Sequence, residues 1–213
     1  IMTVEDPVEY DLPGISQTQI NMRAGMTFAK GLRAILRQDP DVILIGEIRD
    51  RETAEIATQA SLTGHLVLST LHTNTAAGAI TRLQDIGIDN FLLASTIRGI
   101  VAQRLLRKLC EHCRIAVGCD EFQSNLLGIK AGDTIYQANG CQQCNNTGFH
   151  GRQALFELVV IDTELQTLIH DEAGEPLLEK AVRSKTPSIR EAGFEQVKLG
   201  KTTIEEVLRV TSL

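Results

Sequence analysis

The chain has 213 residues, of which 43% are hydrophobic and 23% charged. This composition is close to that of an average soluble domain, and it excludes a disordered or fibrous protein. The formal net charge of −6 opposes non-specific binding to nucleic acid, so we expect no nucleic-acid partner. The apolar stretch 91–97 is too short to span a bilayer, and membrane attachment is expected to come through a partner protein.

The first residues of the chain are apolar and end at a group of acids. Residues 1–4 have the pattern of the end of a buried strand, which stops at Glu5, Asp6 and Pro7. Because a chain seldom begins in the middle of a strand, we expect the sequence to be part of a longer protein whose N-terminal part precedes it.

A helix and a buried strand are predicted next. Thr27 can cap a helix with an apolar stripe, and Pro40 ends that helix. The residue before a proline avoids the helical conformation, so Asp39 is the expected stop. The four aliphatic residues 42–45 then predict a strand buried on both faces, with Glu47 just beyond its end.

Helix and strand alternate again further along the chain. Residues 51–63 predict a helix that Gly64 terminates, and residues 66–68 predict another strand, which leads to His72. A helix is expected after it. This alternation predicts an α/β fold in which a parallel sheet is covered by helices with right-handed crossovers.

Three of the predicted strands end in side chains that can do chemistry. Glu5 and Asp6 follow the first strand, Glu47 follows the second, and His72 follows the third. Open parallel sheets bind their ligands at the carboxyl ends of the strands, so these residues predict a shared site. Each residue taken alone could also be a turn residue or a polar group with satisfied hydrogen bonds.

Residues 42–47 fit the pattern of a Walker B strand. In such a strand the terminal carboxylate acts through Mg²⁺ or a water on the γ-phosphate of a nucleotide. Aliphatic runs that end in an acid also occur in many other α/β domains. The chain contains no G-x-x-x-x-G-K-[ST] motif, which would hold the phosphates. Either the protein is not a P-loop enzyme, or the loop precedes Ile1.

Four of the five cysteines form two CxxC pairs, and residues 114–140 separate the pairs. These four are Cys110, Cys113, Cys141 and Cys144, and Cys119 is left over. Four thiolates complete the tetrahedral shell of a zinc ion, so we predict a structural Zn²⁺ site in a reducing compartment. A redox role of the CxxC motif is the alternative, although a redox pair would need no duplicate.

The rest of the sequence contains no cluster of candidate catalytic or ligand-binding residues. An amphipathic stretch runs from 92 to 109, and residues 154–160 predict a short strand. Small helices are predicted at residues 165–170, 176–182 and 204–210. We expect this C-terminal part to be a helical packing or interface subdomain.

These segments together resemble the type II secretion ATPases, the E-type proteins of the general secretory pathway within the secretion ATPase superfamily. TVEDPVEY (3–10) resembles the family's aspartate box, GLRAILRQDPDVILIGEIRD (31–50) its arginine helix and Walker B strand, and TGHLVLSTLHTN (63–74) its histidine box. The paired CxxC motifs resemble its zinc-binding insertion. Residues 170–193 resemble the C-terminal region of the type II branch.

The resemblance implies a RecA-like ATPase that uses ATP and Mg²⁺ and forms a homo-hexamer. Such a motor drives pseudopilus assembly for protein export. It is cytoplasmic and peripheral to the inner membrane, where it binds the cytoplasmic domain of an inner-membrane secretion protein. Because the family's P-loop precedes the aspartate box, the chain would be a C-terminal fragment without the P-loop and inactive alone.

The resemblance also assigns roles to the acids and the histidine. Glu47 would be the Walker B glutamate that positions Mg²⁺ and the attacking water, and His72 would contact the γ-phosphate. Glu5, Asp6 and Glu9 would be the acids of the aspartate box. Spacing leaves open whether Glu5 or Glu9 polarises the water.

Four arginines and a threonine complete the residues that the resemblance assigns to the site. Arg33 and Arg37 would act in catalysis, and Arg49, Arg82 and Thr70 would contact the nucleotide. A guanidinium from a neighbouring subunit can stabilise the transition state of phosphoryl transfer. Alternatively, Arg33 and Arg37 are solvated, and Arg49 forms a surface ion pair with its neighbour Asp50 that contributes little.

Three parts of the chain are expected. Residues 1–107 would be the C-terminal part of the RecA-like domain, 108–150 a tetracysteine zinc subdomain, and 151–213 a mainly helical subdomain. Two other functions stay open: a type IV pilus extension ATPase, which shares the same boxes and cysteines, and a non-catalytic zinc-bearing interaction module. Pilus retraction ATPases are disfavoured because, in this resemblance, they lack the tetracysteine insertion.

Overall fold

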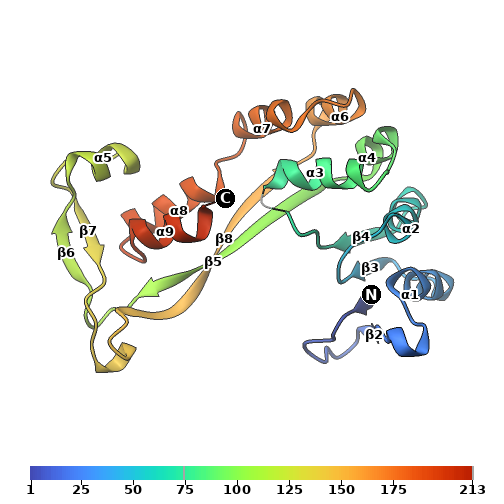
Figure 1. Ribbon diagram of the computed structural model, residues 1–213, viewed down its shortest axis with the longest axis horizontal. Coiled ribbons are helices and arrows are strands. Elements are labelled where there is room, and N and C mark those ends of the chain that lie inside the picture. The colour runs from blue at the N-terminus through green and yellow to red at the C-terminus, as the bar shows by residue number, and fades with distance from the viewer. Residues whose placement is uncertain (74, 213) are drawn as a thin grey trace. The chain divides into compact units, whose positions relative to one another are not determined.

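The computed structural model describes residues 1–73 and 75–212 (Figure 1). The chain forms two compact units: Ile1–Ile100 with Val160–Val182, and Val101–Val159 with the residues from Arg183 on. None of the helices in this described part combines the length and apolar composition of a bilayer-spanning helix. The division into three parts at residues 107 and 150 stays a prediction.

The first unit is built on a four-stranded parallel sheet. Its strands β1 (Met2–Glu5), β2 (Ser16–Gln19), β3 (Val42–Ile45) and β4 (Leu66–Ser69) lie in the order β2-β1-β3-β4 (Figure 1). The prediction of a parallel sheet is therefore confirmed, as are the three strands read from apolar runs. The sequence does not predict β2, because SQTQ has no apolar residue and the strand lies at the edge of the sheet.

Two helices pack on one face of this sheet. Helix α1 (Phe28–Ile35) is capped by Thr27 as predicted and continues into the 3₁₀ turn η2 (Leu36–Gln38), while α2 (Arg51–Leu62) is capped by Asp50. A short 3₁₀ turn, η1 (Met22–Ala24), precedes α1. The core between sheet and helices consists of Val4, Ile20, Ala29, Leu32, Ile35, Ile43, Ile45, Ile56, Ala57 and Ala60.

The opposite face of the sheet is open in the described chain. Successive side chains of a strand point to opposite faces, so those next to the core positions of β3 and β4 point to this face. They include Leu44, Leu66 and Leu68. The exposed fractions of Leu66 and Leu68 are 53% and 45%. The prediction that 42–45 is buried on both faces is therefore wrong for the described residues, because helices cover only one side.

Four further helices belong mainly to the first unit. They are α3 (Ala76–Asp85), α4 (Asn90–Thr96), α6 (Thr163–His170) and α7 (Glu175–Arg183). Helices α4 and α6 pack against each other, and each carries a buried residue, Leu93 in α4 and Ile169 in α6. The Thr75 hydroxyl, which caps α3, also donates a hydrogen bond to Glu175 at the start of α7. The helices predicted at 165–170 and 176–182 are confirmed.

The second unit combines β-strand pairs with helices. Strand β5 (Gly99–Leu109) pairs with β8 (Phe149–Val160), and β6 (Ile115–Gly118) pairs with β7 (Thr134–Gln137). The helices are α5 (Glu121–Leu127), η3 (Gln142–Cys144), α8 (Ile189–Lys198) and α9 (Ile204–Thr211). One core packs α5, β7, α8 and α9 together and is made of Cys119, Leu127, Ile135, Phe194, Val197, Ile204 and Val207.

A buried carboxylate connects β5 to α9. Glu206 accepts hydrogen bonds from the backbone N–H of Arg107 at 2.9 Å and from the guanidinium groups of Arg107 and Arg209, each at 2.7 Å. Burial raises the pKa of Glu206, but the hydrogen bonds from the two arginines outweigh it and lower the pKa from 4.5 to about 2. Both carboxylate oxygens are thus satisfied, which allows a charge in the core of this unit.

Substitution of Glu206 should destabilise the protein in a pH-dependent way. Because the pKa is lowered in the folded state, the stabilising effect is complete above the ordinary value of 4.5 and disappears as the pH falls towards about 2. We expect Glu206→Gln to lower the free energy of unfolding by about 3 kcal/mol at pH 7. Urea denaturation of wild type and variant between pH 7 and pH 2.5 measures the difference, which should shrink with falling pH.

The control is Glu205→Gln at the exposed neighbouring position, which should change stability by less than about 0.5 kcal/mol. A difference between wild type and Glu206→Gln that stays constant over the whole pH range would contradict the assignment.

Candidate functional site

The carboxyl ends of three adjacent strands bring the predicted polar residues to one edge of the sheet. The strand register aligns Val4 with Ile45, and Ile45 with Ser69. Glu5 lies one residue beyond this row on β1. Glu47 lies two residues beyond it, after β3, and His72 lies three residues beyond it, after β4. The expected common edge is therefore present, while the catalytic roles of these residues stay predictions.

Glu47 is the buried acid of this edge, with an exposed fraction of 8%. Its Oε2 lies 2.5 Å from Nε of Arg49 and 3.2 Å from Nε2 of His72. The Arg49 guanidinium lowers the pKa of Glu47, burial partly opposes this effect, and His72 lowers the pKa further. The carboxylate is consequently ionised at neutral pH.

One oxygen of Glu47 retains capacity to accept a hydrogen bond. Although Oε2 lies within ion-pairing distance of two cationic side chains, no hydrogen bond of regular geometry reaches it from the described residues. Arg49 and His72 are themselves mostly exposed, at 67% and 84% of their side-chain surfaces. Such a carboxylate can accept a hydrogen bond from a water or bind through a metal-bound water.

The segment that carries Glu47 is held between β1 and β4. The N–H of Gly46 donates to the carbonyl of Val4 at 2.7 Å, and the hydroxyl of Thr70 donates to the carbonyl of Gly46 at 2.5 Å. A Cβ on residue 46 would lie 3.3 Å from both the Val4 oxygen and Glu5 Cα, so glycine permits this close approach. Thr70 therefore has a structural contact here, and its nucleotide contact stays a prediction.

The aspartate-box acids differ in their surroundings. Glu5 Oε1 accepts hydrogen bonds from Thr3 Oγ1 at 2.5 Å and from Gln17 Nε2 at 2.9 Å. Asp6 and Glu9 are exposed. Gln17 is a site neighbour that the sequence does not reveal, because it lies on the polar strand β2. The structure thus orients Glu5 by two hydrogen bonds, and the choice between Glu5 and Glu9 as the group that polarises water stays open.

The predicted arginines do not all gather at Glu47. Arg49 forms an ion pair with Glu47, whereas Arg33 pairs with Glu52 on α2 at 2.7 Å. The side chains in the Arg33 pair are about half exposed, so this ion pair contributes little stability. Arg37 in η2 and Arg82 in α3 are also exposed. Asn74, the last residue of the histidine-box stretch, lies outside the described residues.

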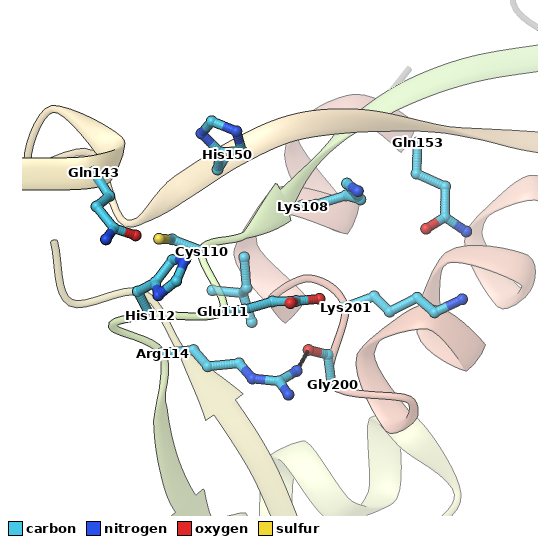
Figure 2. Close-up of a pocket in the computed structure, with 11 residues that line it drawn as sticks. Lys108, Cys110, Glu111, His112, Arg114, Gln143, His150, Gln153, Gly200 and Lys201 are labelled. Atoms are coloured by element: carbon cyan, nitrogen blue, oxygen red, sulfur yellow. Dashed lines mark hydrogen bonds between the residues drawn. The ribbon is translucent and has the colours of Figure 1, made fainter. Parts of the chain in front are cut away.

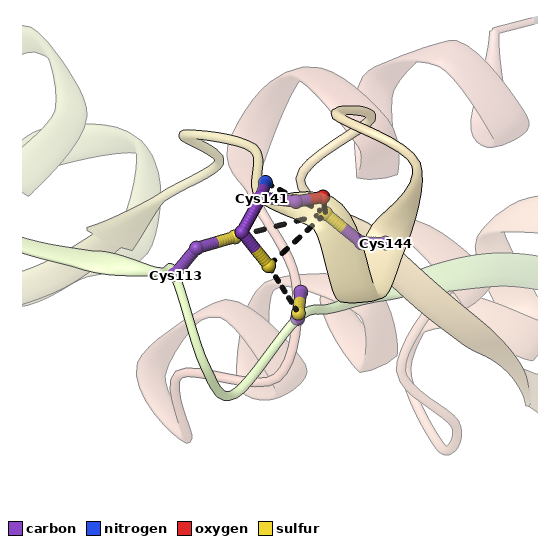
Figure 3. Close-up of side chains that lie close together, drawn as sticks. Cys113, Cys141 and Cys144 are labelled. Atoms are coloured by element: carbon purple, nitrogen blue, oxygen red, sulfur yellow. Dashed lines mark hydrogen bonds between the residues drawn. The ribbon is translucent and has the colours of Figure 1, made fainter.

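The four cysteines of the CxxC motifs converge on one point in the second unit (Figure 3). All four Sγ atoms lie within 4.8 Å of one another. The Sγ–Sγ distance is 3.9 Å for Cys110–Cys141 and 3.8 Å for both Cys113–Cys144 and Cys141–Cys144. A tetrahedral ZnS₄ centre with Zn–S bonds of about 2.3 Å has S···S edges of about 3.8 Å. Three of the sulfur–sulfur distances match these edges, so the cluster fits a zinc ion.

Backbone N–H groups surround these sulfur atoms. Gly140 N donates to Cys113 Sγ at 3.3 Å, and the N–H groups of Cys141 and Gly148 each donate to Cys144 Sγ at 3.2 Å. Burial raises the pKa of Cys144, but the two backbone donors outweigh it and lower the pKa to about 6. Burial raises the pKa of Cys113 to about 11. A divalent cation would stabilise the four thiolates and offset two of their four negative charges.

Comparison with known proteins places these features in a family. The family model described as "Type II/IV secretion system protein" matches residues 1–209. The type II secretion system ATPase E of Vibrio cholerae is 57% identical over 99% of this chain and 42% of the relative. Type II secretion system protein E of Pseudomonas aeruginosa is 58% identical with the same coverage. The chain thus spans less than half the length of these relatives.

A solved structure shares the fold. The crystal structure of the pilus retraction motor PilT with bound ADP has a TM-score of 0.70 and 30% sequence identity, over 98% of this chain and 51% of that chain. The mixed α/β fold with a parallel sheet is therefore that of a secretion or pilus motor ATPase. The resemblance inferred from the sequence boxes is confirmed at the level of the family. The chain belongs to the family of type II/IV secretion system proteins.

Proposed function

We propose that this chain is part of a motor ATPase that drives protein export by type II secretion. The observation that carries the proposal is the buried, ionised Glu47 at the end of β3, with Arg49 and His72 beside it. Relatives with 57% and 58% identity are named type II secretion proteins, which supports this branch over pilus extension ATPases. ATP and Mg²⁺ are the proposed cofactors.

The geometry supports distinct roles for the residues at the sheet edge. Bound Mg²⁺-ATP would supply the γ-phosphoryl group and the Lewis acid. Glu47 accepts a hydrogen bond from the attacking water through Oε2, which no regular hydrogen bond occupies. His72 and Arg49, both largely exposed, can exchange part of their contact with Glu47 for the phosphate charge. Glu5 is held at the same edge by its two hydrogen bonds.

A longer chain is proposed to complete this site. Parallel sheets are almost always covered on both faces, whereas here Leu66 and Leu68 leave one face exposed in the described chain. The chain also matches only 42% of the length of its relatives. We infer that a preceding segment covers the open face and supplies the phosphate-binding loop, and that the 213-residue chain alone does not turn over ATP.

The assembly is proposed to be a cytoplasmic homo-hexamer. The exposed positions of Arg33, Arg37 and Arg82 suit contacts with a neighbouring subunit, where a guanidinium can act on the nucleotide in trans. The hexamer would bind the cytoplasmic domain of an inner-membrane secretion protein and extend the pseudopilus. Conformational change at the subunit boundary would transmit the motion.

The tetracysteine cluster is proposed to hold a structural Zn²⁺. Four sulfur ligands leave no open coordination position for catalysis, so the ion would stabilise the local fold. This cluster is also the basis of the second candidate function, a non-catalytic zinc-bearing interaction module. ATP turnover by the extended protein discriminates between the two functions.

Glu47→Gln should abolish most ATP hydrolysis in the protein extended at its N-terminus to the length of its relatives. Loss of the negative charge that orients the water is expected to lower kcat by about 10²- to 10³-fold, with ATP binding retained. Steady-state phosphate release and equilibrium binding of a fluorescent ATP analogue measure the two effects.

The matched control for this change is Glu55→Gln, which removes an exposed carboxylate paired with Arg51 on α2 and should leave kcat unchanged. Equal turnover by wild type and Glu47→Gln would show that the Walker B assignment is wrong. Absence of turnover in the extended wild type would favour the interaction module.

Cys110→Ser should remove zinc from the protein. Loss of one of four ligands is expected to lower zinc affinity at least about tenfold and to lower the melting temperature, because metal binding and folding are coupled. Zinc content per chain and thermal unfolding are measured together. Cys119→Ser is the control for zinc content and should retain the metal, because Cys119 donates a hydrogen bond to the carbonyl of Lys130 away from the cluster. Unchanged zinc content and melting temperature in Cys110→Ser would refute the site.

A further inference from the structure

A single glutamine side chain joins the polar strand β2 to the acids that follow β1. Gln17 lies opposite Thr3 in the parallel pair of β1 and β2, and Glu5 lies two residues further along β1. Side chains two residues apart on a strand point to the same face of the sheet, so Thr3 and Glu5 share the face opposite the core residue Val4. Paired residues of neighbouring strands share a face as well, which brings the Gln17 amide beside the Glu5 carboxylate.

Both polar atoms of the Gln17 amide have partners within the protein. Its Nε2 donates to Glu5 Oε1 at 2.9 Å and to the carbonyl of Tyr10 at 3.0 Å, and its Oε1 accepts from the N–H of Leu12 at 2.8 Å. Because the first two partners are acceptors and the third is a donor, only one orientation of the amide satisfies all of them. The side chain therefore fixes Glu5 relative to the segment that follows it.

The segment that carries Glu9 is restrained by the same strand. The N–H of Val8 donates to Gln19 Oε1 at 3.3 Å, and the carbonyl of Tyr10 accepts from Gln17. Glu9 is exposed and lies between Val8 and Tyr10, so its backbone is held on both sides by side chains of β2. An ordered backbone lowers the entropic cost of placing an exposed carboxylate against a ligand.

These contacts leave one oxygen of Glu5 available. The hydroxyl of Thr3 also donates to Oε1 of Glu5, at 2.5 Å, so both side-chain donors use the same oxygen. Within the described chain, no protein group donates to Oε2 of Glu5. A carboxylate that is anchored through one oxygen presents the other to a water or a ligand in a fixed direction.

The lining of the pocket beside the tetracysteine cluster does not converge in this way (Figure 2). There, Arg114 Nη1 donates to the carbonyl of Gly200 at 2.7 Å. Figure 2 shows the ammonium groups of Lys108 and Lys201 apart from each other. The donors and acceptors around Gln17, by contrast, all meet on one amide group.

We propose that Gln17 is a positioning residue of the aspartate box. It holds the carboxylate of Glu5 and the segment that carries Glu9 against β2, and it acts on the reaction only through these acids. This inference rests on the proposed ATPase function, because the acids need a reaction to serve. The alternative is that the amide only stabilises the fold of an edge strand.

The test uses the protein extended at its N-terminus to the length of its relatives. Gln17→Met keeps the length and the unbranched shape of the side chain but removes its hydrogen bonds. We expect kcat for ATP hydrolysis to fall at least about tenfold with the KM for ATP unchanged, because a small displacement of a catalytic group has a large effect on rate. Gln59→Met makes the same change at an exposed position of α2 and should match wild type.

Double variants separate positioning from a structural role. Gln17→Met is combined with Glu5→Gln and, separately, with Glu9→Gln, and single-turnover hydrolysis of radiolabelled ATP measures the slow variants. If Gln17 acts through one of these acids, its substitution has little further effect once that acid is removed. Such coupling supports the proposal and identifies the acid. A full effect of Gln17→Met in both backgrounds, or an unchanged kcat in Gln17→Met alone, overturns it.

Failure of the proposed function has a different signature. If the extended wild type does not hydrolyse ATP, the ATPase proposal fails and this inference with it. If wild type and Gln17→Met hydrolyse ATP equally, this inference fails alone. Should Gln17→Met not fold, Gln17→Glu is the second variant: it keeps an acceptor for Leu12 but sets another carboxylate beside Glu5, and it should lower kcat as well.

The contact itself can be measured without ATP. In the 213-residue chain, amide hydrogen exchange at Leu12 should be faster in Gln17→Met than in Gln59→Met, because Gln17 accepts the hydrogen bond of that amide. Equal exchange rates in the two variants would overturn the proposal.

Discussion

The parallel register of β1, β3 and β4 is the constraint on which the candidate site depends. It ends three strands at one edge and places Glu5, Glu47 and His72 within three residues of the same row. A slip of one residue would turn the side chains of a strand to the opposite face. The close contact of Gly46 with β1 and the Thr70 hydrogen bond keep the Glu47 segment in this register.

Two buried carboxylates show how a site differs from a structural ion pair. Glu206 accepts hydrogen bonds on both oxygens from Arg107 and Arg209, so its hydrogen-bonding capacity is satisfied within the protein. Glu47 is charged and almost as deeply buried, yet its Oε2 has no regular hydrogen bond within the described residues. Because its ion-pair partners Arg49 and His72 are mostly exposed and can exchange their contacts for a ligand, its position at the end of a strand favours function over packing.

The cysteines, like the two carboxylates, fall into a candidate site and a structural core. Four of them converge in two turns where backbone N–H groups donate to sulfur, whereas Cys119 packs with Val197 and Val207 in the core of the second unit. That core joins the segment around the cysteines to the last two helices. The tetracysteine cluster and the last two helices therefore belong to one unit.

The sequence by itself determined the features that depend on neighbouring residues. These are the strands predicted at 42–45 and 66–68, the cap at Thr27, and the two CxxC pairs, because periodicity, capping and ligand spacing are local properties. Tertiary structure alone decided that Arg49 and not Arg33 contacts Glu47, that Gln17 of the polar strand β2 holds Glu5, and that one face of the sheet stays open in the described chain. These contacts depend on strand order and helix packing between distant segments, which no local pattern encodes.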